Sequence, residues 1–466
     1  MEKYMLEPLM KSSSGGSSLL MRTKNIDDLP DVLLVEILCR LPCNKLIFQC
    51  KLVSKPWYKL ISAPYFVRRY LCLQRQMQKP VLLTTLVRLN VGIPGKPLII
   101  TSDHPVFKTA ASSNFTLNFL PCYSQAKQLE EPGSWGAPVV VGTHNDLVLC
   151  CATKNYQRDY YLCNPYTKQW VSLPPTPQVY RNALVGFLCD PYFKYYSSDH
   201  HNGEEERRTS FIVDAEYKWK VVRVILNPSD PNFRLEIFSS ETRQWGEIFV
   251  ECSQPFSSFA CDDFFDNTRK PRSSLASVAY KGMLYWWCEK DLTLELDVSD
   301  SNIPKYRFIE LLENFESTVG LGVLGVGGGR LQLCMHEEYL SRDHDEVQQV
   351  FRVRELKQVV KDRQGKLKWL ADRVTIVSES KDIEVYPRPF TNPKILAFHP
   401  NNEDVVYLTT EAGCKIFTCS LREGTLREIS KLEVSKLEAP IRGSKKTFSY
   451  SFSLPWWPTP VPKTLE

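Results

Sequence analysis

Apolar residues recur at helical spacing between residues 26 and about 70. The first predicted helix lies within residues 28–41, where Pro30 suits the first turn and Pro42 stops the helix. Its apolar positions are Leu33, Leu34, Ile37, Leu38 and Leu41. Because these positions recur every three or four residues, the segment is predicted to present an apolar stripe.

Two further short helices are predicted before Pro64. Asn44 and Ser54 are residue types that cap helices. The second helix carries Leu46, Ile47, Cys50 and Val53, and the third carries Trp57, Leu60 and Ile61. Three helices of this length bury only a small core, so the unit is expected to pack on a neighbour or to keep an apolar face for a partner.

Beyond about residue 80 the pattern changes to short alternating runs bounded by Gly, Asn, Pro and Asp. The chain contains 21 Gly, 31 Pro, 10 Trp, 21 Tyr and 23 Phe. Such a composition favours many short aromatic-rich strands separated by turns. The fold class is therefore predicted to be mainly β, after a small helical module.

Two sequence elements repeat within the predicted β region. Residues 164–170 and 239–245 each form a turn that follows a strand-like run and ends in Trp170 or Trp245, and both tryptophans are predicted to be packing residues. A turn followed by an apolar strand recurs at residues 144–150, 281–287, 328–334 and 403–408. At about 40 to 50 residues per blade, the region predicts a β-propeller of about six to eight blades.

The helical segment resembles the F-box of ubiquitin-ligase substrate receptors. The resemblance spans about 40 residues and depends on several apolar and Pro positions agreeing in order, among them Leu29-Pro30, Leu41-Pro42, Val53 to Trp57 and Pro64 to Phe66. Ser54 stands where many members have Cys. The resemblance implies docking on a Skp-type adaptor, which joins a cullin scaffold and a RING subunit. The residues implied to form the adaptor face, or the core behind it, are Leu29, Pro30, Ile37, Leu38, Leu41, Pro42, Val53, Trp57, Leu60 and Ile61.

The remainder resembles the F-box-associated, kelch-like propeller region of plant F-box proteins. The resemblance is carried by Asn164-Pro165 with Trp170, by residues 282–287 and by residues 454–460. The expected organisation is a disordered arm at 1–25, an F-box at 26–70, a linker with the first strands at 71–134, and the propeller at 135–466. The Pro-rich segment from Leu454 to Pro462 is expected to close or flank the last blade.

Charge and cysteine usage narrow the choice of partners and compartment. The 58 Lys and Arg and 53 Asp and Glu are spread without a basic block, so nucleic acid is not an expected partner. The 15 cysteines show no Cys-x-x-Cys pair and many sit in apolar runs, which predicts buried reduced thiols. No secretory signal and no run of about 18 apolar residues occurs, so we expect a protein of the cytoplasm, the nucleus or both, without a membrane partner.

The sequence offers no positive sign of catalysis. Residues 320–325 fit a dinucleotide-binding glycine pattern, but a strand-like run follows where a helix would have to begin, so a Gly-rich strand and turn is predicted. The seven histidines lack the His-Glu-x-x-His spacing, and no Gly-x-Ser-x-Gly is present. We therefore predict no catalytic residue, no metal and no cofactor, and a protein that is not an enzyme.

Together these features predict the substrate-recognition subunit of an SCF-type (Skp-cullin-F-box) ubiquitin ligase. The helices would hold the adaptor, and the propeller would hold a protein substrate of unknown identity, so that catalysis depends on proximity. Two alternatives stay open. One is an F-box scaffold whose partner is bound but not degraded, and the other is a propeller with its own ligand-binding or enzymatic pocket.

Overall fold

The structure is a computed structural model, and it describes residues 26, 29–41, 44–76, 86–90, 98–100, 117–121, 139–152, 157–180, 183–189, 193–195, 211–213, 218–226, 232–251, 277–288, 292–299, 303–310, 321–340, 347–357, 368–377, 393–399, 402–409, 416–430, 447–451 and 457–461. The chain divides into two compact units, Met1–Leu73 and Gln74–Glu466. The arm predicted at residues 1–25 lies outside the described residues.

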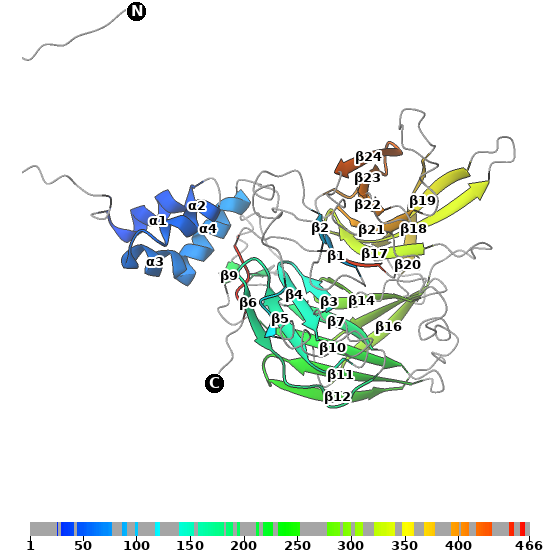
Figure 1. The fold of residues 1–466 in the computed structure, drawn as a ribbon, viewed down its shortest axis with the longest axis horizontal. Helices are drawn as coiled ribbons and strands as arrows, with labels where there is room; N and C mark the ends of the chain where they lie inside the picture. Colours follow the sequence, from blue (N-terminus) through cyan, green and yellow to red (C-terminus); the bar gives the residue numbers. More distant parts are fainter. Residues whose placement is uncertain are drawn as a thin grey trace, which may run out of the picture. The chain divides into compact units, whose positions relative to one another are not determined.

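The described residues of the first unit form four helices, one more than the three predicted (Figure 1). They are α1 (Asp31–Cys39), α2 (Asn44–Cys50), α3 (Lys55–Ser62) and α4 (Pro64–Gln76). The Ser54 hydroxyl accepts a hydrogen bond from the Trp57 amide at 3.3 Å, so the predicted cap of α3 is confirmed. Ala63 is extended and ends α3, but Pro64 then begins α4, because proline suits the first turn of a helix as well as it ends one.

The core of the helical unit draws side chains from all four helices. α4 supplies Phe66, Tyr70, Leu71 and Leu73, so the helix that was not predicted covers much of this core. The buried apolar side chains of the other three helices are Leu34, Val35, Leu38, Cys39, Ile47, Trp57 and Ile61. Burying such side chains is the main stabilising contribution available to a unit of this size.

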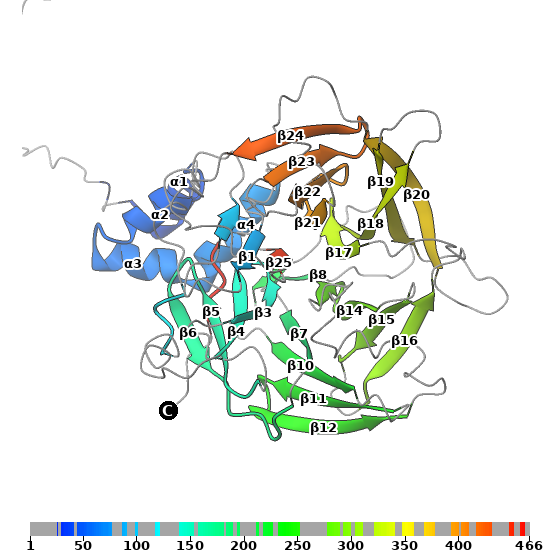
Figure 2. The ribbon, with the colours of Figure 1, turned by 45° about the vertical axis from the view of Figure 1, so that its right-hand side comes forward.

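The second unit contains five four-stranded antiparallel sheets, which are the blades of a β-propeller (Figures 1 and 2). We number them in chain order: blade 1 is β3 (Val139–His144), β4 (Leu147–Cys151), β5 (Tyr160–Asn164) and β6 (Gln169–Ser172); blade 2 is β7 (Leu184–Cys189), β10 (Trp219–Leu226), β11 (Phe233–Ser239) and β12 (Gln244–Val250); blade 3 is β13 (Val278–Tyr280), β14 (Met283–Cys288), β15 (Leu292–Asp297) and β16 (Lys305–Glu310); blade 4 is β17 (Leu321–Gly327), β18 (Arg330–Leu340), β19 (Val347–Lys357) and β20 (Lys368–Val377); blade 5 is β21 (Lys394–Phe398), β22 (Val405–Thr409), β23 (Ile416–Ser420) and β24 (Thr425–Ser430).

A three-stranded sheet stands between blades 5 and 1, and we call it the closing sheet. Its order is β2 (Leu98–Ile100), β1 (Leu86–Asn90) and β25 (Thr447–Ser451), and β25 contacts both β21 and β3. A separate two-stranded sheet pairs β8 (Phe193–Tyr195) with β9 (Phe211–Val213). The described residues thus give five four-stranded blades and not the six to eight predicted. The prediction assumed about 40 to 50 residues for each blade, but several connections between strands are long, so some blades take up more of the chain.

The sequence repeats are the tight turns of the blades. Residues 164–170 and 239–245 join β5 to β6 and β11 to β12, and Lys168 and Arg243 both have φ of 57° at equivalent positions. The other repeat joins the first two strands of blades 1, 3, 4 and 5. In blade 4 this turn is Gly328-Gly329, with φ of 56° and 77°, and it follows the strand predicted for the Gly-rich segment. The predicted hairpins and turns are therefore confirmed.

Neighbouring blades pack by placing an aromatic ring against a glycine of an inner strand. A Cβ on Gly186 of β7 would lie 2.6 Å from the Trp286 ring of β14, and a Cβ on Gly322 of β17 would lie 2.6 Å from Trp287. Two adjacent tryptophans on β14 thus face opposite ways, one into blade 2 and one into blade 4. Because the rings occupy the volume of a missing side chain, the glycines are needed for this close approach.

Residues 457–461, which we call the clasp segment, pack against blade 1. The Asp146 carboxylate accepts from the Thr459 amide at 2.8 Å, and the Asn164 side-chain amide donates to the Thr459 carbonyl at 2.8 Å. Val461 joins the apolar core between blades 1 and 2. The Pro-rich segment was predicted to close or flank the last blade. Its described part instead lies on blade 1, because the contacts that hold it involve residues about 300 positions away.

Candidate functional site

Helix α1 is apolar on the side that faces the core and also on the side that faces solvent. Leu34, Val35, Leu38 and Cys39 are buried, whereas Val32, Leu33 and Ile37 are exposed. A helix that is apolar all round is normally buried on all sides. The exposed side of α1 therefore carries apolar side chains of the kind that are normally covered by other protein.

Exposed apolar side chains are concentrated in the helical unit. Of the fourteen large hydrophobic side chains exposed among the described residues, nine belong to this unit. We call these nine the exposed apolar set: Ile26, Val32, Leu33, Ile37, Leu46, Leu52, Val53, Tyr58 and Tyr65. Exposed apolar residues that gather in one part of a protein mark candidate sites of protein–protein interaction, so these nine are the candidate docking residues.

The connection between α2 and α3 carries the most exposed member of this set. Leu52 is 86% exposed and Val53 is 63% exposed. Before them, the Lys51 ammonium lies 5.2 Å from the centre of the Phe48 ring and 5.8 Å from that of Tyr58, and burial lowers its pKa. These cation–π contacts join the end of α2 to α3. Leu52 and Val53 are therefore exposed directly after a residue that contacts both flanking helices.

The residues predicted for the adaptor face differ in how far they are exposed. Pro30, Ile37 and Val53 are exposed, whereas Leu38, Trp57 and Ile61 are buried in the helical core. Leu29, Leu41 and Leu60 are partly buried, and Pro42 lies outside the described residues. The exposed residues are available to a partner directly, and the buried ones shape the surface from behind.

Seven members of the exposed apolar set were not among the predicted site residues. They are Ile26, Val32, Leu33, Leu46, Leu52, Tyr58 and Tyr65. For α1 the sequence held a signal, because Val32 and Leu33 precede Leu34 and Val35 in one continuous run that exceeds a single stripe. For Leu52 the signal was an aliphatic pair within a polar connection between two helices.

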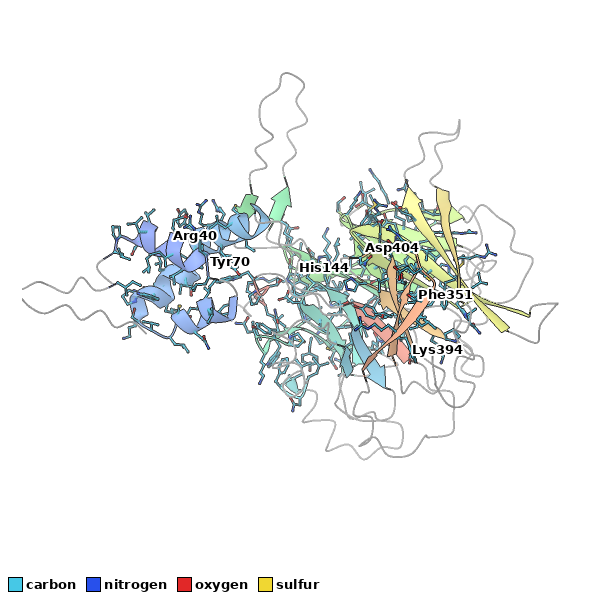
Figure 3. The ribbon with its side chains drawn as sticks, turned by 90° about the horizontal axis from the view of Figure 1, so that it is seen from above. Arg40, Tyr70, His144, Phe351, Lys394 and Asp404 are labelled. Atoms are coloured by element: carbon cyan, nitrogen blue, oxygen red, sulfur yellow. The ribbon has the colours of Figure 1, made fainter. Side chains whose placement is uncertain are left out.

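Ion pairs hold α1 against α4. Glu36 of α1 pairs with Arg69 of α4 and, at 2.9 Å, with Arg40 at the end of α1. The hydrogen bond from Arg69 is the main cause that lowers the pKa of Glu36. Figure 3 labels Arg40 on this unit together with Tyr70, which is buried on α4. The Glu36–Arg69 pair thus joins α4 to α1, the helix that carries Val32, Leu33 and Ile37 of the exposed apolar set.

Blade 2 contains a buried ion pair. Arg223 of β10 pairs with Glu236 of β11, and its guanidinium also donates to the carbonyl oxygens of Gln178, at 3.0 Å, and Gln157, at 3.2 Å. The segment that links blades 1 and 2 is thereby tied to blade 2. Buried charges that are paired and hydrogen-bonded in this way are structural in the first instance.

The described residues were compared with the requirements of a metal site, a reactive thiol and a membrane-spanning helix. No group of three or more His, Cys, Asp or Glu there could hold a metal ion. The nine cysteines described as free include seven that are buried, and burial raises the pKa of Cys39 to about 12. Among the described helices, none is long and apolar enough to cross a membrane.

Comparison with known proteins finds similar proteins in Arabidopsis thaliana. F-box protein At2g23160 of Arabidopsis thaliana is 27% identical over 201 residues, which cover 42% of this chain and 62% of that protein. F-box protein At5g49610 of the same plant is 26% identical over 324 residues, which cover 67% of this chain and 70% of that protein. The match thus spans less than two thirds of the length of the first relative.

Solved structures give a weaker likeness. The β-propeller domain of Cps50 (Swd1) from Myceliophteria thermophila is 7% identical, with 63% of this chain and 86% of that domain covered, at a TM-score of 0.28. This score is too low to add to the assignment.

Two family matches divide the chain in the same way as the structure does. Residues 26–69 match the F-box domain, and they include the described helices α1 to α3 and the start of α4. Residues 123–447 match the family described as F-box protein At3g26010-like, beta-propeller, and this match covers more than half of the chain and includes all five blades. The chain therefore belongs to the F-box proteins with an At3g26010-like β-propeller.

Proposed function

We propose that this protein is the substrate receptor of an SCF-type ubiquitin ligase. Its helices dock on a Skp-type adaptor and, through it, on cullin and RING subunits, while the propeller recruits a protein substrate. The receptor performs no chemistry of its own, and it acts in the cytoplasm, the nucleus or both. Ubiquitin transfer is then accelerated by holding substrate and ubiquitin-carrying enzyme in one assembly.

The observation that carries the proposal is the exposed apolar set of the F-box. An F-box domain implies binding of a Skp-type adaptor in general. The nine large apolar side chains exposed in the helical unit would be covered by such a partner. A few aliphatic and aromatic anchors usually supply most of the affinity of an interface. The exposed Leu33, Ile37 and Leu52 are suited to that role.

The first test replaces Leu33 and Leu52 together by Asp in the full-length protein. Both side chains are exposed, so the helices should stay folded while the apolar contact is lost. We expect adaptor binding to weaken by at least a hundredfold in a pull-down or calorimetric titration. The matched control is Phe249→Asp, which places the same charge at a 69% exposed aromatic of blade 2 and should leave adaptor binding unchanged. Unchanged binding by the folded double variant would show that the adaptor uses another surface.

The same double variant separates degradation from scaffolding. A receptor that binds its substrate but not the adaptor should protect that substrate from degradation, so the substrate's level should rise in cells that express the variant. If removing the wild-type receptor leaves the level of every captured partner unchanged, the scaffold alternative replaces the ligase proposal.

A further inference from the structure

The clasp segment is held at the backbone of one residue, Thr459, by two buried side chains of blade 1. The Asp146 carboxylate accepts a hydrogen bond from the backbone amide of Thr459 at 2.8 Å. Asn164 donates to the Thr459 carbonyl at 2.8 Å and to Asp146 at 2.7 Å. Residue 459 is thus held by both its backbone amide and its backbone carbonyl.

The site is buried and is built on a rigid hairpin turn. Asp146 and Asn164 are fully buried, and Thr459 is 7% exposed. The Asn164 side-chain oxygen also accepts from the amides of Tyr166, at 3.0 Å, and Thr167, at 3.2 Å, which fixes its position in the β5–β6 turn. Burial is the main reason that the pKa of Asp146 is raised, to about 6. A second negative charge at this place would be costly, because a buried carboxylate already lacks the solvation that water gives it.

Thr459 is followed by Pro460, whose side chain is exposed. A Thr-Pro pair is the dipeptide on which proline-directed protein kinases act. The residue that such a kinase would modify is the one whose backbone amide and carbonyl the Asp146–Asn164 site holds. The segment can meet a kinase only after it leaves blade 1, and short peripheral segments held by few contacts open far more readily than the core strands of a fold.

We propose that Thr459 is a phosphorylation site for a proline-directed kinase and that the Asp146–Asn164 site is the latch which this modification opens. In the reaction the Thr459 oxygen attacks the γ-phosphorus of ATP, the bond to the β-phosphate oxygen breaks, ADP leaves, and the hydroxyl proton passes to the kinase base. The phosphothreonine carries between one and a half and two negative charges near pH 7.

Modification would hold the segment in its released state. A phosphate on Thr459 would have to return beside Asp146, whose carboxylate holds the amide of the same residue. Like-charge repulsion and the size of the phosphate both oppose this rebinding. Val461 would then leave the core between blades 1 and 2. The latch couples a covalent change at residue 459 to the packing of the blade that carries the Asn164 turn.

The chain contains a matched control for this proposal. Thr176-Pro177 is the other Thr-Pro pair, and Thr176 is 5% exposed, much like Thr459. Its hydroxyl donates to the Gln178 carbonyl at 3.0 Å, and Gln178 is in turn held by Arg223 of blade 2. Thr176 therefore lies in a segment fixed between two blades, and a kinase should reach it only after the propeller unfolds.

The experiment treats full-length protein with a purified proline-directed kinase and ATP, and follows phosphate at both threonines by mass spectrometry. Asn164→Asp keeps the oxygen acceptor of the turn but removes the amide donors and adds a carboxylate beside Asp146. We expect phosphate on Thr459 of the wild type, incorporation at least tenfold faster in Asn164→Asp, and none on Thr176 of either protein. Thr459→Val, which keeps the side chain's shape without the hydroxyl, should take up no phosphate at this site.

Hydrogen exchange then tests the release. In the phosphorylated protein the amides of Thr459 and Val461 should exchange at least tenfold faster, while those of blade 3 keep their protection. The proposal is overturned if Thr459 stays unmodified in both proteins, if Thr176 is modified as fast as Thr459, or if the modified segment remains protected.

Discussion

The F-box helices and the propeller blades treat large apolar side chains in opposite ways. In the helices, Val32, Leu33 and Ile37 lie exposed beside a core made of their immediate neighbours. In the blades, Trp286 and Trp287 are also sequence neighbours, but both are buried, one against each adjoining blade. The blades thus cover one another, whereas the helices leave one apolar side uncovered.

This contrast teaches how to separate side chains that stabilise the fold from those that await a partner. A residue of the first kind should affect unfolding and leave adaptor binding intact as long as the unit stays folded. A residue of the second kind should do the reverse. The predictions below test this separation, beginning with the largest expected change in free energy of unfolding.

Replacing Phe66 by Ala should produce the largest loss of stability. Phe66 of α4 is fully buried, and removing such a ring leaves a cavity that costs about 3 to 5 kcal/mol. The control Leu52→Ala should change the free energy of unfolding by less than about 0.5 kcal/mol, because Leu52 is solvent-exposed. Urea unfolding of both variants, followed by helical circular dichroism, makes the measurement. Equal losses would mean that the exposed set is part of the core.

A pH dependence should distinguish the buried carboxyl of blade 1 from the surface carboxyl of the F-box. Burial raises the pKa of Asp146 from 3.8 to about 6. The folded protein therefore holds this proton more tightly than the unfolded chain, so the associated stability is present below about pH 4 and lost as pH rises through 6. The loss should approach about 3 kcal/mol, measured as the difference between wild type and Asp146→Asn in unfolding titrations from pH 4 to 7.

For Glu36, the free energy of unfolding should change with pH in the opposite direction. The Arg69 hydrogen bond lowers its pKa, so the stabilisation is present above the pKa of the unfolded chain and is lost as pH falls through the folded value. Glu36→Gln should flatten the acid side of the F-box unfolding profile only. If the two variants flatten the same pH range, the assignment of Asp146 as the buried proton holder is wrong.

Replacing Gly186 by Ala should destabilise the propeller by about 1 to 3 kcal/mol, because the added methyl would overlap the Trp286 ring of the next blade. Gly246→Ala is the matched control, since its nearest neighbour atom would be 3.8 Å away. It should leave stability unchanged or slightly raised, because alanine reduces the freedom of the unfolded chain. Thermal unfolding monitored by tryptophan fluorescence measures both. A tolerated Gly186→Ala would show that the blades can shift apart at no cost.

The smallest expected effect is a change in association rate. Residues 26–76 contain eight Lys or Arg and four Asp or Glu, so this unit holds most of the chain's formal net charge of +5. An acidic partner would be steered towards it, and raising the salt from 50 to 500 mM should slow adaptor association several-fold while changing dissociation little. If stopped-flow mixing gives an association rate that does not depend on salt, electrostatic steering does not contribute to docking.

Local features of this fold were predictable because they depend on neighbours in sequence. The Ser54 cap, the apolar spacing of α1 to α3 and the two hairpins that contain Trp170 and Trp245 all follow from short patterns. Trp245 packs between Tyr160 and Phe238, as predicted for a packing residue. Trp170 in the equivalent hairpin is 42% exposed, so the same local pattern does not determine how much of the ring is covered.

The rest depended on contacts between distant parts of the chain. Pro64 is compatible with both the end of one helix and the start of another, and only the burial of Phe66 and Tyr70 in the shared core decides for α4. The place of the clasp segment required Asp146 and Asn164, far away in sequence. Within α1, apolar residues for the core and for the surface belong to the same residue types, so their division could not be predicted before the packing was known.

The closing sheet also sets an order of events during protein synthesis. β1 begins at Leu86, but its partner β25 begins at Thr447, so the ribosome must make the whole series of blades before this pairing becomes available. Contacts between such distant residues form slowly, since a long loop must close first. Until then, β1 keeps the backbone edge opposite β2 unpaired, and such an edge can form incorrect β pairs. Chaperone demand should therefore be highest for nascent chains in which all five blades have been made and residues 447–451 have not yet left the ribosome.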